Sequence, residues 1–425
     1  MAGTTVGAAK ASASVARPDS GRLIECVALF SVALDDSLPS ETPLARFQAV
    51  KMVARDGPLQ AALPSTLPMY AFPMGVGRSD ELGDSFFHSF SLADDGGRRM
   101  VGHCYTAYVE DTAHCLVILS CSSFHQSISR FLKSFVRNFP MDRILAPGGV
   151  QLAAKMLEGP LPPRGDPLII HVGAQSICCL HPTRRTLPLC DLNMRMLFRW
   201  LEAPLIARLL TALLNERQVI VVSSSISKLT PTMDSALALL YPFEWEHEYV
   251  PLLPCSALHY IHAPIPYFIG VPRALLPPAS QLPSEALLFD LDGAPALVEQ
   301  DGASPLTELP TRVVRKLVLL LERYHKTVDE EHQGQSETDS PINKLRKGIL
   351  GIWVALLARF TEFEAKDASG FDGARFLRSV GEENEEFLRM LVHTSSFLSM
   401  ASRRMRANPD EDLFDILVRR RPQQS

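Results

Sequence analysis

The segment NERQVIVVSSSISKLTPTMDSALALLYP, residues 215–242, carries the clearest structural pattern of the chain. Within it, residues 217–225, RQVIVVSSS, predict a fully buried strand. The residues that follow predict a helix, with Thr230 as its N-cap and Pro231 in its first turn. An apolar periodicity over Leu201–Leu214 predicts another helix before the strand. A helix, a buried strand and a second helix indicate an α/β lobe whose parallel or mixed sheet is covered on both faces.

The segment upstream of this block is rich in predicted strands. Residues 22–34 and 115–122 each predict a strand, and residues 85–109 predict a hairpin. The hairpin turn is expected at residues 94–97, Asp-Asp-Gly-Gly, because glycine tolerates positive φ.

A predicted helix over residues 124–139 completes this upstream lobe. Its apolar stripe consists of Phe124, Ile128, Phe131, Leu132 and Phe135. Strands followed by a helix predict a small α+β lobe over residues 21–139. Five prolines and four glycines over residues 140–166 then predict a linker.

The rest of the chain divides into a central domain and a helical segment. The central domain is expected over residues 167–305, and the helical segment over residues 306–419. Within the helical segment, residues 327–341 are acidic and polar, which favours a mobile loop between two strong helices. Residues 1–20 are interpreted as a disordered tail, with a transit peptide as the alternative, and residues 420–425 as a second tail.

The composition narrows the class of protein. A formal net charge of −5 over 425 residues argues against a nucleic-acid binder and gives no support to a basic membrane-surface domain. The longest apolar run, residues 349–358, falls short of the ~18 residues that a membrane span needs. No two of the eight cysteines form a C-x-x-C pair, so they are interpreted as reduced core cysteines of an intracellular protein.

The sequence LLFDLDGAP, residues 287–295, resembles the first motif of phosphohydrolases of the haloacid-dehalogenase type. There, the residues equivalent to Asp290 and Asp292 would be the nucleophile and the acid–base beside Mg²⁺. The motif needs partners on later strands of the same sheet, whereas here helices follow and Ala294 stands where threonine is usual. The late acids, which helix capping explains, are Asp410, Glu411 and Asp412. A strand that ends in an Asp-Gly turn is the favoured interpretation.

No other stretch forms a convincing catalytic or metal-binding set, so neither a cofactor nor a metal is expected. The three serines that follow the buried strand lack the G-x-S-x-G elbow of a hydrolase, and capping explains them better. Residues 171–181 hold two adjacent cysteines between two histidines, without the second pair that a zinc site needs; the four are His171, Cys178, Cys179 and His181. All three tryptophans are interpreted as core residues: Trp200, Trp245 and Trp353.

Residues 215–272 resemble the central block of DENN-domain proteins. The matching pieces are Glu216-Arg217 before the strand, then ALLYPFEWEHEYVPLLP, then APIPYFIGV. The resemblance extends upstream, where the F-P-x-G and F-H-S-F elements of the longin-like DENN segment are present at residues 72–75 and 87–90. The predicted strand and Asp-Leu-Asp at 287–292 look like the strand that follows the central block in that family. The helices after residue 306 occupy the position of the downstream segment.

This resemblance implies a longin-like upstream lobe, a central α/β domain and a helical downstream segment. It also implies guanine-nucleotide exchange on a Rab-type GTPase, which would bind across the first two lobes without covalent chemistry. Membrane-trafficking machinery is the implied setting, with the protein cytoplasmic and peripheral on endomembranes. Two alternatives remain open: a DENN scaffold that binds a GTPase or another DENN protein without exchange, and a folliculin-like GTPase activator.

Polar residues at strand ends and loops are the candidate GTPase contacts. These are Ser223, Ser224, Ser225, His247 and His262. An activator would instead supply an arginine from the upstream lobe to stabilise transition-state charge. The arginines available there are Arg98, Arg99, Arg130 and Arg137, of which the last two are expected on the solvated face of a helix.

Overall fold

The computed structural model describes residues 22–33, 48–54, 66–75, 85–93, 99–110, 112–122, 124–180, 186–293, 297–299, 304–328, 340–357, 359–363, 371–406 and 413–420. Its contacts divide the chain into two compact units. The first unit extends to Leu180 and also takes in Ser225–Thr230 and Tyr249–Tyr260. The second unit comprises His181–Ser224, Pro231–Glu248 and the chain from Ile261 onward.

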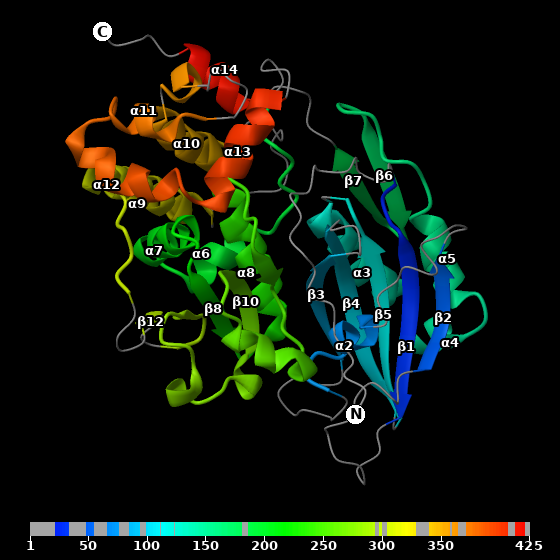
Figure 1. Ribbon diagram of the computed structural model, residues 1–425. Coiled ribbons are helices and arrows are strands. Elements are labelled where there is room, and N and C mark those ends of the chain that lie inside the picture. Colours follow the sequence, from blue (N-terminus) through cyan, green and yellow to red (C-terminus); the bar gives the residue numbers. More distant parts are fainter. Residues whose placement is uncertain are drawn as a thin grey trace. The chain divides into compact units, whose positions relative to one another are not determined.

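The first unit is built on a five-stranded antiparallel sheet of order β2-β1-β5-β4-β3 (Figure 1). Its strands are β1 (Cys26–Ala33), β2 (Gln48–Ala54), β3 (Ser85–Ala93), β4 (Arg99–Val109) and β5 (Thr112–Ser120). The predicted hairpin is confirmed, because β3 and β4 pair along their whole length. The turn predicted at residues 94–97 lies outside the described residues.

Helix α3 (His125–Asn138) contacts β4 and also a separate hairpin, formed by β6 (Pro167–Val172) and β7 (Gln175–Leu180). All five members of its predicted apolar stripe are buried. The periodicity of 3.6 residues therefore identified the buried face of this helix correctly.

The segment expected to be a linker, residues 140–166, contains two helices. These are α4 (Met141–Leu145) and α5 (Gly149–Met156), and they contact the first sheet at β1, β2 and β4. A proline and a glycine mark where the two helices begin. Pro140 precedes α4, and Gly148 precedes α5 in the left-handed conformation, φ +90°. This segment thus lies inside the first unit, which continues to Leu180.

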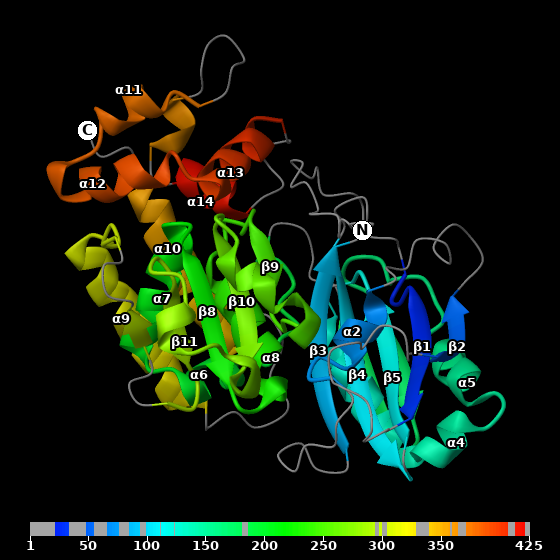
Figure 2. The same cartoon turned by 60° about the horizontal axis from the view of Figure 1, so that its bottom comes forward.

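The second sheet has the strand order β12-β11-β8-β10-β9. Its strands are β8 (Gln218–Ser223), β9 (Glu248–Val250), β10 (Tyr267–Pro272), β11 (Leu287–Asp290) and β12 (Leu297–Glu299). Strand β8 runs parallel to β10 and β11, whereas β12 is antiparallel to β11, so the sheet is mixed (Figure 2). The run Val219–Ser223 is buried throughout, which shows that both faces of the sheet are covered, as predicted.

Helices form the remainder of the chain. Before and around the second sheet are α6 (Arg195–Trp200), α7 (Ala203–Leu214), α8 (Ile226–Leu239) and η2 (Cys255–His262). After it come α9 (Thr311–Val328), α10 (Pro341–Leu356), η6 (Phe360–Phe363), α11 (Gly373–Leu377), α12 (Glu382–Leu391), α13 (Ser395–Arg406) and α14 (Leu413–Arg420). The expected mobile loop falls largely on residues 329–339, which lie outside the described residues, as do most of both expected tails. No helix in the described ranges is both long and apolar enough to cross a bilayer.

Several local expectations differ from the structure. Helix α8 begins at Ile226, so Thr230 is not its N-cap and Pro231 lies inside it. Of the three tryptophans, Trp353 is fully buried, whereas Trp200 and Trp245 are half-buried. None of the eight cysteines forms a disulfide bond: four are buried, three are half-buried and Cys178 is exposed.

Two buried histidines make the first unit sensitive to acid. Burial lowers the pKa of His88 to about 4, although its hydrogen bond to the Tyr70 carbonyl acts in the opposite direction. Burial and the neighbouring His125 together lower the pKa of His103 to about 3. Since the unfolded chain takes up these protons near pH 6.5, both histidines stabilise the fold above that pH. Stability should fall as the pH drops from 6.5 toward 4, by up to about 1.4 kcal/mol per pH unit for each group.

Urea unfolding of the full chain at pH 7.5, 5.5 and 4.5 measures this dependence. His103→Gln should flatten the dependence by about one proton, whereas His171→Gln, at an exposed position, should leave it unchanged. A His103→Gln profile that parallels the native one would show that His103 is protonated in the folded protein.

The packing of α4, α5 and the β6–β7 hairpin on the first sheet and α3 generates a second prediction. A fragment of residues 1–140 loses the helices that contact β1 and β2, so it should unfold non-cooperatively and bind hydrophobic dyes. A fragment of residues 1–180 keeps these helices and should retain more secondary structure by circular dichroism. Equal thermal transitions for the two fragments would show that residues 141–180 contribute nothing to this unit.

Candidate functional site

Three parallel strands of the second sheet end at one edge, and polar residues follow each of them. Ser223 ends β8, Asp290 ends β11, and Arg273 follows β10. In α/β sheets the carboxyl ends of parallel strands are where ligands bind. This carboxyl edge therefore contains two of the predicted contacts, Ser223 and Ser224, together with the Asp-Leu-Asp-Gly motif.

One oxygen of each carboxylate in that motif accepts several hydrogen bonds. Asp290 Oδ1 accepts from the backbone N–H groups of Asp292, at 2.9 Å, and Gly293, at 2.8 Å. The same oxygen accepts from the Arg273 guanidinium. A Cβ at residue 293 would lie 2.3 Å from Asp290 Oδ2, so the turn requires glycine.

The second aspartate binds the serines at the end of β8. Asp292 Oδ2 accepts from Ser223 Oγ at 3.0 Å, and from the N–H and Oγ of Ser224, the latter at 2.9 Å. Within the described ranges, no three His, Cys, Asp or Glu side chains are grouped as a metal site would need. The two aspartates thus close a turn and fix the end of β8, which agrees with the interpretation of the motif as a strand end.

The other predicted contacts lie elsewhere. Ser225 is half-buried, with its Oγ 2.9 Å from that of Ser227. His262 is exposed at the end of η2, next to Ala263, whose carbonyl accepts from Gln218 Nε2 at 2.9 Å. Gln218, which holds the segment next to His262, is the first residue of β8, whereas Ser224 follows the last residue of that strand. His262 and Ser224 therefore lie near opposite ends of β8. Six strand residues at about 3.3 Å each separate them by about 20 Å.

His247 belongs to a half-buried cluster around Glu216. Its Nε2 lies 2.9 Å from Glu216 Oε2, and its ring meets that of Trp245 edge-on, with centroids 5.3 Å apart. Glu216 Oε1 also accepts from the N–H and Oγ of Ser396, at 2.9 and 3.1 Å. Burial would raise the pKa of this carboxyl, but the hydrogen bonds from His247 and Ser396 outweigh it, and the pKa of Glu216 is lowered.

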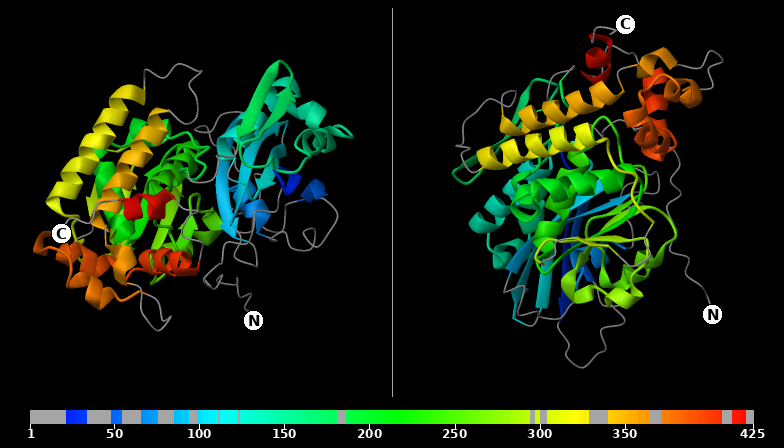
Figure 3. Two further views of the ribbon diagram at one scale, coloured as in Figure 1. Left: turned by 90° about the horizontal axis from the view of Figure 1, so that it is seen from above. Right: turned by 90° about the vertical axis from the view of Figure 1, so that its left-hand side faces the viewer.

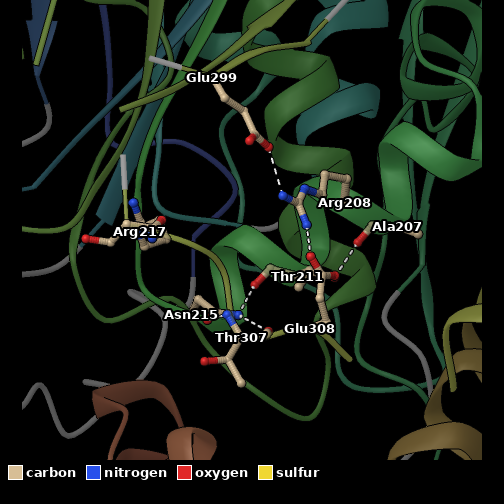
Figure 4. A network of polar contacts seen from close by, with 9 residues as sticks. Ala207, Arg208, Thr211, Asn215, Arg217, Glu299, Thr307 and Glu308 are labelled. Carbon is tan, nitrogen blue, oxygen red and sulfur yellow. Dashed lines mark hydrogen bonds and ion pairs between the residues drawn. The ribbon is translucent and has the colours of Figure 1, made fainter. Parts of the chain in front are cut away.

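Both neighbours of Glu216 are also bound to distant segments, and Figure 4 shows the contact between Asn215 and Thr307. Asn215 exchanges hydrogen bonds with the backbone of Thr307, at 2.9 Å from its Oδ1 and 3.0 Å from its Nδ2. Arg217 donates to the Ser304 carbonyl at 2.7 Å and pairs with Glu285 at 2.7 Å. We refer to Asn215-Glu216-Arg217 as the tether turn. The sequence singled out Glu216 and Arg217, but only the fold reveals their partners.

The upstream motifs are also architectural. Phe90 of the F-H-S-F element faces Gly102 of β4, where a Cβ would lie 2.2 Å from its ring. In the F-P-x-G element, the Pro73 carbonyl accepts from the N–H of Cys255 at 2.9 Å. Gly75 has φ +82°, a conformation that glycine adopts readily. The packing of Phe90 and the conformation of Gly75 depend on the residue type, whereas the contact of Pro73 is made by its backbone.

Of the arginines considered for an activator, Arg99 is engaged. Its Nε donates to Ser91 Oγ at 2.7 Å, and its guanidinium lies 4.4 Å from the centroid of the Tyr249 ring. Arg130 and Arg137 are exposed on α3, as predicted, and Arg98 lies outside the described residues.

Two family models match the part of the chain that contains these motifs. The model described as uDENN domain matches residues 49–107, and the model described as DENN (AEX-3) domain matches residues 111–294. The chain belongs to the DENN-domain family. The boundary between the two models falls between β4 and β5, which pair with each other, so the two matches share one sheet. The downstream segment after residue 306, which neither model covers, stays a prediction.

Curated relatives agree with this assignment. DENN domain-containing protein 2C of Mus musculus is 26% identical over 364 residues, which cover 82% of this chain and 39% of the relative. DENN domain-containing protein 2B of Homo sapiens is 24% identical over 374 residues, covering 83% of this chain and 32% of the relative. DENN domain-containing protein 1B of Mus musculus is 28% identical over 215 residues, 50% of this chain and 27% of the relative. The chain spans about two-fifths or less of the length of these relatives.

The hydrogen bonds of Asp290 generate a prediction about the turn at Asp290–Gly293. Asp290→Ala removes the acceptor of two backbone N–H groups and of Arg273, so it should lower the free energy of unfolding by about 1–3 kcal/mol. Asp290→Asn keeps an acceptor oxygen and should cost less. Urea unfolding measures both changes. A Mg²⁺-dependent hydrolysis of p-nitrophenyl phosphate that Asp290→Asn abolishes would instead establish Asp290 as a nucleophile.

Proposed function

We propose that this protein is a guanine-nucleotide exchange factor for a Rab-type small GTPase. The observation that carries the proposal is the presence of uDENN and DENN segments in one chain, whose strands form a common sheet. The resemblance stated above associates that combination with Rab exchange. Both units are proposed to contribute to binding the two switch regions of the GTPase.

Exchange requires differential binding and no nucleophile. A protein that binds the nucleotide-free GTPase more tightly than the GDP-bound form weakens GDP binding by the same factor. The surface must offer shape and hydrogen-bond complementarity to the switch regions. Asp290 and Asp292 accept hydrogen bonds that fix the turn after β11 and the end of β8. Nucleotide exchange does not need either aspartate as a nucleophile.

The predicted contacts divide into two groups by exposure. Ser224 and His262 are exposed, and we propose them as direct contacts. Ser223, Ser225 and His247 are buried or half-buried beside other protein groups, and we propose them as supports that hold the surface in shape. An interface of standard size, about 800 Å² on each partner, is wide enough to include both ends of β8.

The test is GDP release from a panel of Rab proteins loaded with fluorescent GDP, with the full chain and excess GTP. At least one Rab should release GDP tenfold faster or more. His262→Glu should reduce that acceleration at least about tenfold, as expected when a side chain that contacts the partner is replaced by one of opposite character. His393→Glu, which introduces the same charge at another exposed histidine, should leave it unchanged.

Two outcomes would favour the alternatives. A stable complex with nucleotide-free Rab without accelerated release would indicate a scaffold. Faster GTP hydrolysis without faster GDP release would indicate an activator, and loss of that effect in Arg130→Ala or Arg137→Ala would identify the arginine responsible.

A further inference from the structure

Helix α9 in the second unit has two different faces. Leu317, Leu321 and Tyr324 are buried, on the side where α9 contacts α7 and α10. On the opposite side, from Arg315 onward, five exposed residues lie within about 100° of the helix circumference at 3.6 residues per turn. They form what we term the basic strip: Arg315, Lys316, Leu319, Arg323 and Lys326.

In the part of the chain that the structure describes, the cations of the basic strip have no acidic partner. Glu322 lies at its margin, and Arg312, one turn earlier, already pairs with Glu383 at 3.3 Å. The formal net charge of −5 for the whole chain therefore hides a local concentration of positive charge.

The centre of the strip is apolar. Leu319 is 57% exposed, the largest fraction among the exposed large hydrophobic residues of the described ranges. It lies between Lys316 and Arg323, one turn from each. A leucine kept in water costs free energy that burial would recover.

The combination of cations and a central leucine distinguishes between occupants. A purely acidic protein segment would neutralise the cations but would offer no apolar surface to the leucine. An anionic bilayer surface satisfies both, because cations meet the headgroups while the apolar side chain enters the acyl boundary. The strip extends in a line for about 17 Å, from eleven steps of about 1.5 Å, which suits a planar surface.

We propose that the basic strip of α9 docks this protein on the anionic lipid headgroups of a bilayer. The strip is one side of a rigid support, since α9 and α10 lie side by side (Figure 3). A Cβ at Gly348 of α10 would lie 3.0 Å from Leu320, so the two helices are in close contact. Helix α10 also exposes Lys344 and Lys347 beside this contact.

The experiment measures co-sedimentation of the full 425-residue chain with two kinds of vesicle. One is pure phosphatidylcholine, and the other contains phosphatidylserine at about one-third of the lipid. Binding should require phosphatidylserine and should weaken as salt rises from 0.1 to 0.5 M, where the Debye length shortens from about 10 to about 4 Å. The combined variant Arg315→Gln/Lys316→Gln/Arg323→Gln/Lys326→Gln should bind at least about tenfold more weakly.

A matched control removes the same number of charges from the exposed surface of the first unit. It combines Arg130→Gln, Arg137→Gln, Arg143→Gln and Lys155→Gln, all at exposed positions, and it should bind within about twofold of the unmodified chain. Thermal unfolding of both variants verifies that each is folded.

A second measurement locates the contact directly and does not depend on the combined variant. Leu319→Trp places a fluorophore at the centre of the strip, and lipids brominated on their acyl chains should quench it when phosphatidylserine vesicles are added. Leu398→Trp, at a position on α13 that is 48% exposed, should not be quenched.

Three results would overturn the proposal: equal binding to both kinds of vesicle, a combined variant that binds like the control, and absence of quenching at residue 319. If the strip bound poly-glutamate but not vesicles, its occupant would be an acidic protein. Exchange assayed in solution without vesicles does not involve the strip, so this proposal and the proposed function fail separately.

Discussion

The second unit depends on the hydrogen bonds of the tether turn, Asn215-Glu216-Arg217, which precedes β8. Each of its three side chains binds a segment far away in the sequence. Glu216 has the strongest constraint: its φ of +51° is costly for a residue other than glycine, and its carboxylate is half-buried, which costs part of its hydration. Both costs are offset because the carboxylate accepts from Ser396 and lies against His247.

The Glu216 interaction joins the central sheet to the C-terminal helices. Ser396 is in the first turn of α13, where backbone N–H groups have no partner within the helix and the helix dipole favours an anion. Glu216 thus caps a helix that lies 180 residues further along the chain. A family model that ends at residue 294 describes a segment that, in this protein, is bonded to residues beyond its end. The exchange surface we propose therefore lies on a lobe whose rigidity comes partly from the helical segment.

Local patterns in the sequence predicted several helices and strands, but they could not predict contacts between residues far apart in the sequence. The strand after Gln218 and the stripe of α3 follow from periodicity, which is a property of neighbouring residues. The partners of Glu216 depend on a contact across 180 residues, which no local pattern encodes. The linker predicted at 140–166 is wrong because prolines and glycines are not always signs of irregular chain. Here Pro140 and Gly148 precede two helices that pack on the first sheet. The net charge of the whole chain is negative and gives no sign of the basic strip. The strip is recognised only when the residues of α9 are assigned to faces of the helix.

The most direct test of the central role of Glu216 compares two glycine substitutions at residues with the same backbone strain. Glu216 and Glu110 both have positive φ, at +51° and +52°, but Glu110 is exposed in the turn between β4 and β5, where water screens its charge. Glycine relieves the strain at either position, so side-chain contacts determine the difference. Glu216→Gly should lower the free energy of unfolding by more than about 1 kcal/mol, as removal of a helix cap does, whereas Glu110→Gly should leave it nearly unchanged or raise it. Equal effects of the two substitutions in urea unfolding would contradict this account.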